Sequence, residues 1–336
     1  MTTFDDEFWR RWIGALQQLQ ADMRAALCSH MAEQSIEHLS RTVRDDDGDT
    51  VFGIDAHVET ILLQTCEAWG RRQRLTLVAE GLPSGGVTFG GDTTSEGPPL
   101  RLLVDPIDGT RGLMFDKRSA WSLAAIAPDR GAETRLSDVV IAVMTELPTT
   151  RQATSDVLWA GRGRGAGGRR DDLVRKTATN LPLLPSRATN LRHGFATVSN
   201  FFQGGKELLA RLEESILRRA LGGWNPDKAE VYTDQYICSG GQLAELMLGR
   251  DRFVLDVRPL AHQKLGFSTT LACRPYDLAT MLIAQEAGCV VCDPLGGPLD
   301  APLDTTTNLA FAGYANPKLA QALIPIVREE VARHLG

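Results

Sequence analysis

The chain has 336 residues, 43% of them hydrophobic and 23% charged, so it is long enough to bury a substantial core and to form two subdomains. Its 36 Lys and Arg residues against 42 Asp and Glu residues give a formal net charge of −6, which argues against a protein that binds nucleic-acid polymers through a basic surface. The sequence contains neither the run of about 20 apolar residues typical of a membrane helix nor a signal-peptide pattern, so we expect a cytoplasmic protein with no membrane partner.

The first half of the chain shows both helical and strand patterns. Apolar residues spaced three and four apart predict helices over residues 5–35 and 55–69. Short apolar runs then predict strands over residues 75–79, 102–104, 121–127 and 139–144. Residues 81–99, between the first two of these strands, are rich in glycine, proline and threonine and predict a long loop.

Two motifs that could bind ligands have simpler structural explanations. The glycine-rich residues 161–168 lack the Gly-Lys-Ser/Thr ending of a phosphate loop and a clear helix after it, so the sequence favours a hairpin between strands. Cys289 and Cys292 bracket a predicted buried strand, and a zinc site needs further ligands nearby. We therefore expect two cysteines of the hydrophobic core.

The second half begins after residues 180–192, which are rich in proline and polar residues. We expect this segment to separate an N-terminal α+β subdomain, residues 1–188, from a C-terminal α/β subdomain, residues 189–336. The elements predicted beyond it are helices over residues 206–220 and 241–248, a strand over 252–257, a helix over 277–287, a strand over 289–292 and a helix over 316–334. Because strands and helices mix without strict alternation, we expect an α/β fold of layered α+β type with antiparallel pairing.

The most informative segment is Asp105-Pro-Ile-Asp-Gly-Thr110, which follows an apolar strand. Pro106 biases Asp105 toward an extended conformation, so the chain turns sharply as it leaves the strand. The carboxylates of Asp105 and Asp108 and the carbonyl of Ile107 can then face one point. Clustered oxygen ligands of this kind suit Mg²⁺ or Mn²⁺.

The end of the same segment suits a phosphate group. Gly109 allows close backbone approach, and Thr110 offers a hydroxyl at a predicted helix start, where free amides can bind an anion. As isolated residues, Asp105 and Asp108 could equally be turn and capping residues. The complete string after an apolar strand is far more specific than two aspartates alone.

Several motifs occur in the order found in one enzyme family. The segment from Asp105 to Thr110 matches that family's Asp-Pro-Ile-Asp-Gly-Thr signature. The other segments that resemble its motifs are residues 54–59, 78–81, 159–166, 275–279 and 286–288. The chain thus resembles the inositol monophosphatase family, the lithium-sensitive, magnesium-dependent group that includes fructose-1,6-bisphosphatases and 3′-phosphoadenosine phosphatases.

This resemblance implies alternating α-β-α-β-α layers and a site for two or three Mg²⁺ ions, with Mn²⁺ as a possible substitute. It implies that Glu80, Asp105 and the Ile107 carbonyl hold the first ion. Asp105 would bridge to a second ion, which Asp108 and Asp277 would also hold. A weaker third ion would involve Glu80. On its own, Asp277 could be a helix cap.

The resemblance also implies catalytic and substrate-binding roles. Asp55 and Thr110 would orient and deprotonate the attacking water, and Glu80 would act with them. The amides of Gly109 and Thr110 would bind phosphate oxygens. The residues implied to bind substrate are Gly109, Thr110, Ser239, Gly240 and Asp277.

Departures from the family pattern leave the substrate open. Gly81 replaces the second acid of the usual Glu-Glu pair, and residues 81–99 and 258–274 are longer than in simple monophosphatases. The substrate could be an inositol phosphate, a sugar phosphate or bisphosphate, or a nucleotide 3′-phosphate. The basic residues that could meet a second phosphate are Arg111, Lys117, Arg187, Arg192, Lys206 and Arg274.

We therefore expect a magnesium-dependent phosphomonoesterase that hydrolyses a small phosphorylated alcohol, and by resemblance a homodimer. Two alternatives remain: a catalytically silent regulatory or binding protein on the same scaffold, and a phosphatase for an unusual biosynthetic phosphate ester. The silent alternative is disfavoured because the chain keeps the whole expected set of site residues, Asp55, Glu80, Asp105, Asp108, Thr110 and Asp277.

Overall fold

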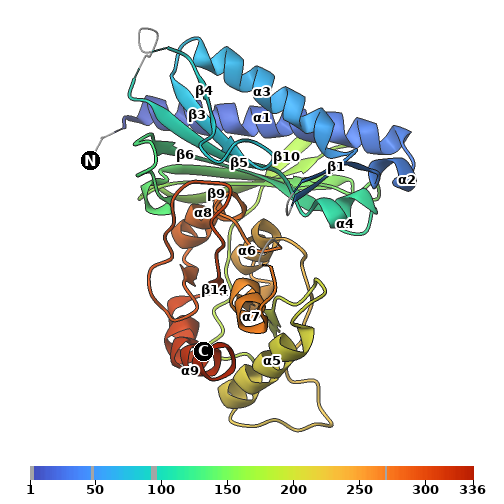
Figure 1. Cartoon of the computed structure of the whole chain (residues 1–336), viewed down its shortest axis with the longest axis vertical. Coiled ribbons are helices and arrows are strands. Elements are labelled where there is room, and N and C mark those ends of the chain that lie inside the picture. The colour runs from blue at the N-terminus through green and yellow to red at the C-terminus, as the bar shows by residue number, and fades with distance from the viewer. Residues whose placement is uncertain (1–3, 47–48, 92–96, 269–270) are drawn as a thin grey trace. The chain divides into compact units, whose positions relative to one another are not determined.

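A computed structural model describes residues 4–46, 49–91, 97–268 and 271–336 (Figure 1). The chain forms two compact units, each built from separate stretches of sequence. The first unit comprises Met1–Pro182, Arg274–Glu286 and Ala301–Thr307, and the second comprises Leu183–Cys273, Ala287–Asp300 and Asn308–Gly336.

These units differ from the contiguous subdomains expected at residues 1–188 and 189–336. The segment that contains Asp277 belongs to the first unit and not to the C-terminal one. The physical reason is packing, because this segment contacts strands of the first unit's sheet. The structure groups the chain into two units of interleaved segments, and all the acidic residues expected to bind metal lie in the first.

An eight-stranded mixed sheet forms the centre of the first unit. Its order is β10-β9-β8-β7-β6-β5-β3-β4. The strands are β3 (Leu75–Ala79), β4 (Val87–Phe89), β5 (Leu100–Asp108), β6 (Ala120–Pro128), β7 (Ile141–Leu147), β8 (Thr154–Gly161), β9 (Gly165–Asp172) and β10 (Thr177–Asn180). β3 and β5 pair in parallel, whereas the other neighbours pair antiparallel.

Long helices α1 (Asp6–Glu33) and α3 (Asp55–Gly70) lie side by side on one face of this sheet (Figure 1). The α1 helix begins where the Asp5 carboxylate accepts a hydrogen bond of 2.8 Å from the Phe8 amide. Its buried stripe comprises Trp9, Trp12, Leu16, Leu19, Met23, Leu27 and Met31, together with Gln20.

The short helix α8 (Met281–Glu286) contacts β7, β8 and β9 from the other face (Figure 1). Smaller elements are α2 (Ile36–Leu39), the hairpin β1 (Thr42–Asp46) and β2 (Asp49–Phe52), and α4 (Thr110–Met114).

Local patterns were informative about the connections, with two exceptions. Residues 161–168 form the predicted hairpin, in which Gly161 pairs with Gly165 across β8 and β9. The predicted loop over residues 81–99 instead contains β4, which pairs with β3 at the sheet edge. The single helix predicted over residues 277–287 is divided into a 3₁₀ turn, Tyr276–Leu278, and α8.

A four-stranded mixed sheet forms the second unit, in the order β11-β12-β14-β13. Its strands are β11 (Phe195–Val198), β12 (Asp251–Asp256), β13 (Val290–Cys292) and β14 (Phe311–Tyr314). Its helices are α5 (Lys206–Leu221), α6 (Ser239–Met247), α7 (Arg258–Leu265) and α9 (Pro317–Leu335), and α5 packs along α9. Cys289 and Cys292 are buried thiols, as expected of core residues.

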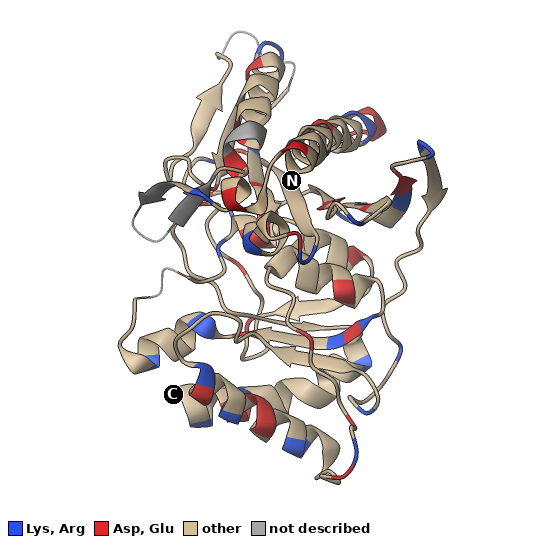
Figure 2. Cartoon of the chain, turned by 90° about the vertical axis from the view of Figure 1, so that its right-hand side faces the viewer, with Lys and Arg blue, Asp and Glu red and all other residues tan. Residues whose placement is uncertain are grey.

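Together the two mixed sheets and their helices confirm the expected α/β class. Within the described part of the chain, each helix is too short or too polar to cross a membrane. Acidic and basic residues are interspersed along the helices and strands of both units (Figure 2).

Candidate metal site

Strand β5 ends in an irregularity that positions two carboxylates. Asp105 lies opposite Leu123 of β6 and Asp108 lies opposite Trp121, so three steps on β5 match two steps on its partner. Such a bulge inserts one extra residue and re-aims the side chains beside it. Asp105 is stabilised in this bend because its Oδ1 accepts a hydrogen bond of 3.0 Å from the Ile107 amide.

The parallel pairing of β3 and β5 brings a third acid to the same edge. Ala79 is in register with Val104, and Glu80 and Asp105 are the next residues of the two strands. Because parallel strands end on the same side of a sheet, Glu80 lies beside Asp105. The sequence predicts both strands, but not that they pair in parallel register.

Asp277 reaches the same place from a distant part of the chain. It lies in the 3₁₀ turn Tyr276–Leu278, which contacts β5 and β6. Its Oδ2 accepts a hydrogen bond of 2.7 Å from the Arg274 amide, three residues earlier in the chain. The cap position of this turn is Pro275, with no side-chain cap hydrogen bond, so Asp277 does not act as the helix cap considered from sequence.

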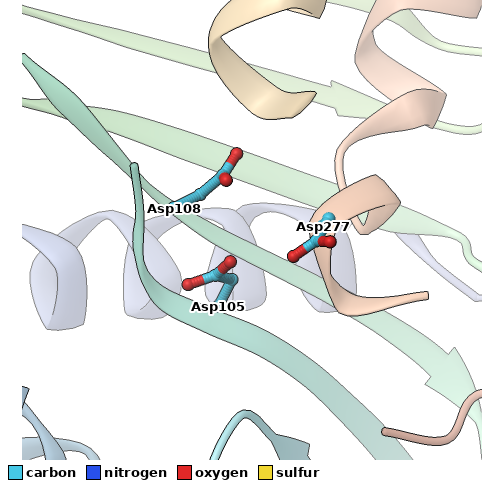
Figure 3. Close-up of side chains that lie close together, drawn as sticks. All are labelled: Asp105, Asp108 and Asp277. Carbon is cyan, nitrogen blue, oxygen red and sulfur yellow. The ribbon is translucent and has the colours of Figure 1, made fainter. Parts of the chain in front are cut away.

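Three carboxylates converge on one point, with one oxygen each from Asp105, Asp108 and Asp277 lying within 4.8 Å of the others. Figure 3 shows the three side chains facing a common space between the end of β5 and the 3₁₀ turn. Asp105 is 2% exposed and Asp108 is 7% exposed, so water screens their repulsion poorly. Glu80 is outside this trio, although its charge acts on Asp105.

Electrostatics make this cluster unfavourable as a set of bare anions. Burial raises the pKa of the Asp105 carboxyl well above its ordinary value. Repulsion from neighbouring carboxylates raises this pKa further, and those neighbours are Glu80, Asp108 and Asp277. A hydrogen bond with the Asp277 carboxyl raises this pKa as well.

A divalent cation fits this group of ligands. The available donors are all oxygens, which Mg²⁺ and Mn²⁺ prefer over softer metals. A cation among them would offset the mutual repulsion of the carboxylates, because each of them would be attracted to it. Asp105 and Asp108 come from the end of β5 and Asp277 comes from a 3₁₀ turn, so these three ligands are held by regular structure.

Two residues are expected to orient the attacking water: Thr110 lies two residues after β5, and Asp55 begins α3. The Thr110 hydroxyl donates a hydrogen bond of 2.8 Å to the Ile107 carbonyl and lies 3.5 Å from Asp55 Oδ1. Asp55 is the first residue of α3, so the helix start directs it toward Thr110. The structure thus places Asp55, Thr110 and Ile107 beside one another. Ser239 and Gly240, also expected at the site, are buried at the start of α6 in the second unit.

Gly109 connects β5 to α4 with φ 103° and ψ 24°, in the left-handed region that side chains disfavour. We expect Gly109→Ala to lower the free energy of unfolding by about 1–3 kcal/mol, as measured by denaturant titration. Gly14→Ala is the matched control, because a Cβ at Gly14 in α1 would have no neighbour within 4 Å. That control should be neutral or stabilising, since alanine favours a helix. Equal destabilisation by both variants would contradict the conformational argument.

The sequence did not indicate how the segment that contains Asp277 is attached to the β8–β9 hairpin. The Glu286 carboxylate, at the end of α8, accepts hydrogen bonds of 2.7 and 2.9 Å from the amides of Gly163 and Gly165. The match of residues 159–166 and 286–288 to family motifs was a signal that both segments mattered. It gave no indication that they touch.

No family model matches the chain, and no curated protein matches it in sequence. Solved structures do match over nearly its full length. The extragenic suppressor protein SuhB from Bartonella henselae is 17% identical, with 95% of this chain and 99% of that chain covered and a TM-score of 0.63. Fructose-1,6-bisphosphatase from Leishmania major is 10% identical, with 94% and 92% covered and a TM-score of 0.67. The Thermotoga maritima IMPase is 16% identical, with 95% and 100% covered and a TM-score of 0.57.

Proposed function

We propose, from a fold shared with inositol monophosphatase and fructose-1,6-bisphosphatase structures, that this chain is a magnesium-dependent phosphomonoesterase. Its substrate would be a small phosphorylated alcohol. The observation that carries the proposal is the convergence of Asp105, Asp108 and Asp277 within 4.8 Å at the end of β5. A metal-dependent phosphatase site needs such a cluster because it must bind the cations that neutralise a phosphate ester.

In this proposal Glu80, Asp105, Asp108, Asp277 and the Ile107 carbonyl hold two or three Mg²⁺ ions. Bound Mg²⁺ would lower the pKa of a coordinated water and neutralise charge on the phosphate. The hydrogen bond that the Thr110 hydroxyl donates to the Ile107 carbonyl fixes the position of that hydroxyl. Thr110 and Asp55 can then orient the attacking water and accept its proton, which requires hydrogen-bond reach and a suitable pKa.

The substrate would be bound by groups of the chain around this centre. We propose that the amides of Gly109 and Thr110 contact phosphate oxygens and that Ser239, Gly240 and Asp277 contact the alcohol. By resemblance to the inositol monophosphatase family, we also propose that the protein is a cytoplasmic homodimer that lithium inhibits. Inhibition by roughly millimolar lithium would support the lithium part of this proposal, because a small cation can occupy a site built for Mg²⁺.

A phosphate-release screen with Mg²⁺ is the direct test. The substrates should be an inositol monophosphate, a sugar monophosphate, a sugar bisphosphate and a nucleotide 3′-phosphate. We expect release from at least one class, and loss of release in excess chelator. A wild-type protein that binds Mg²⁺ and hydrolyses none of them would favour the catalytically silent alternative or an unusual biosynthetic ester.

The Thr110 hydroxyl provides a sharper test of the water-handling role. We expect Thr110→Val to lower kcat by about a hundredfold, because it removes the group that orients and deprotonates the nucleophile while keeping a β-branched side chain of similar size. The Mg²⁺ affinity of this variant, measured by calorimetry, should stay close to that of the wild type. Thr177→Val, on the exposed strand β10, is the matched control and should retain full activity. Unchanged kcat in Thr110→Val would remove Thr110 from the mechanism.

A further inference from the structure

The first unit contains a short returning segment, Ala301–Thr307, whose last four residues form an ordered turn. The Asp304 carboxylate accepts hydrogen bonds of 2.8 Å from the Thr306 amide and of 2.7 Å from the Thr307 amide. It also accepts one of 2.7 Å from the Thr307 hydroxyl. Although burial opposes ionisation, these bonds lower the pKa of Asp304, so the ionised carboxylate organises the turn.

Hydrogen bonds attach this segment to β5, the strand that contains Asp105 and Asp108. Arg101 of β5 donates a hydrogen bond of 3.2 Å from Nη1 to the Leu303 carbonyl. The Arg101 side chain is 8% exposed and is itself held by an ion pair of 3.1 Å with Asp129. Backbone bonds from Leu303 to Thr134 and from Leu136 to Ala301, each 2.9 Å, complete the attachment. The turn is therefore fixed relative to β5.

The same turn also contacts the residue that leads to Asp277. The Arg274 guanidinium donates a hydrogen bond to the Thr306 carbonyl. The Arg274 backbone amide donates to Asp277 Oδ2 at 2.7 Å, and the Asp277 amide donates to the Arg274 carbonyl at 3.1 Å. Arg274 thus joins the turn, through its side chain, to the Asp277 carboxylate, through its backbone.

We propose that Arg274 and the Asp304-centred turn are positioning elements for metal binding, which hold the Asp277 carboxylate against the acids of β5. This inference rests on the proposed function, because it gives the turn a purpose only if Asp277 binds a cation. The connection runs from Arg101 of β5 through Leu303 and Thr306 to Arg274. Partners of this outer kind fix the orientation of metal ligands, and their loss costs about 10–100-fold in metal affinity.

The proposal assigns Arg274 a different role from the one its charge suggests. From sequence, Arg274 was a candidate to meet a second phosphate of the substrate. A phosphate-binding Arg274 would affect substrate KM, and Asp304 would have no part in it. A positioning Arg274 predicts that variants of Arg274 and of Asp304 share one defect, in metal affinity.

The test measures Mn²⁺ binding to the full chain by electron paramagnetic resonance, together with phosphate release at increasing Mg²⁺. We expect Arg274→Ala and Asp304→Ala each to weaken Mn²⁺ binding by about 10–100-fold. At saturating Mg²⁺, both should regain most of the wild-type kcat with substrate KM unchanged. Arg274→Lys, which can still donate to the Thr306 carbonyl, should restore part of the affinity.

Two controls come from the second unit. Arg252→Ala removes an arginine that donates to main-chain carbonyls, including that of Asn190 at 3.1 Å. Asp293→Ala removes a carboxylate that accepts from the Leu295 amide at 2.7 Å in a similar turn. Both controls should bind Mn²⁺ as the wild type does. If Asp304→Ala does not fold, Asp304→Asn takes its place, because it keeps one acceptor oxygen.

The outcomes separate this inference from the proposed function. Unchanged Mn²⁺ affinity in the Asp304 variant, or a higher substrate KM in Arg274→Ala with normal Mn²⁺ binding, would overturn the positioning role. A wild-type protein that binds Mn²⁺ without releasing phosphate would defeat the proposed function, while the Mn²⁺ titrations would still decide the role of Arg274. A wild-type protein that binds no Mn²⁺ would overturn both.

Discussion

Asp105→Asn should lower phosphate release by about a thousandfold at saturating substrate, equivalent to about 4 kcal/mol of lost transition-state stabilisation. Asp105 is the residue expected to bridge two cations, and it is the most buried of the three converging carboxylates. Asparagine has nearly the same shape but lacks the negative charge, so the variant should fold and bind metal poorly. Initial rates across a Mg²⁺ series would measure the effect.

Asp22→Asn is the matched control for this substitution. Asp22 is an exposed residue of α1 that accepts a hydrogen bond of 2.8 Å from Gln18. The control makes the same chemical change on the surface and should keep wild-type rates. Normal hydrolysis by Asp105→Asn would show that the metal assignment is wrong.

Metal-free stability should fall as pH rises from about 4, and Mg²⁺ should reverse that loss. The pKa of Asp105 is raised in the folded state, so the folded protein binds more protons than the unfolded chain between the ordinary carboxyl pKa, 3.8, and the raised value. The free energy of unfolding therefore decreases as pH increases through that window. Denaturant titrations in chelator at a series of pH values would measure the slope, which should be smaller in Asp105→Asn.

At neutral pH, Mg²⁺ at about 100 times its Kd should stabilise the wild type by about 2.7 kcal/mol, because it binds the folded state alone. Asp105→Asn should gain much less from the same addition. Under chelator, however, that variant should be more stable than the wild type, because one buried negative charge has been removed. Equal metal-free stability of the two proteins at neutral pH would contradict the account of the carboxylate cluster.

The sequence predicted those parts of the site that depend on local structure. Asp105, Asp108 and Thr110 lie within six residues, and the proline between the two acids already indicates a bend after a strand. Asp55 and the beginning of α3 follow from helical periodicity in the same way. Such features are set by neighbours in the chain, so they can be recognised before any tertiary contact is known.

Features that depend on distant pairing could not be predicted from residue patterns. The parallel register of β3 with β5, which sets Glu80 beside Asp105, is decided by the whole sheet. A short strand such as β4 is stabilised by its partner more than by its own three residues. The sequence of residues Ala301–Thr307 does not indicate that this segment belongs to the first unit. Its place there depends on backbone hydrogen bonds to distant residues such as Thr134.

The interleaving of the two units has a consequence for how the protein is made. A ribosome that has synthesised the chain as far as Pro182 has made the whole large sheet, with Asp105 and Asp108 at the end of β5. Asp277, the third carboxylate, is synthesised about a hundred residues later, and the Asp304-centred turn that positions it is synthesised later still. In the proposed metal centre, the full set of carboxylates is therefore available only after translation has passed Asp277, and fragments cut at residue 188 would carry an incomplete centre even when their sheet folds.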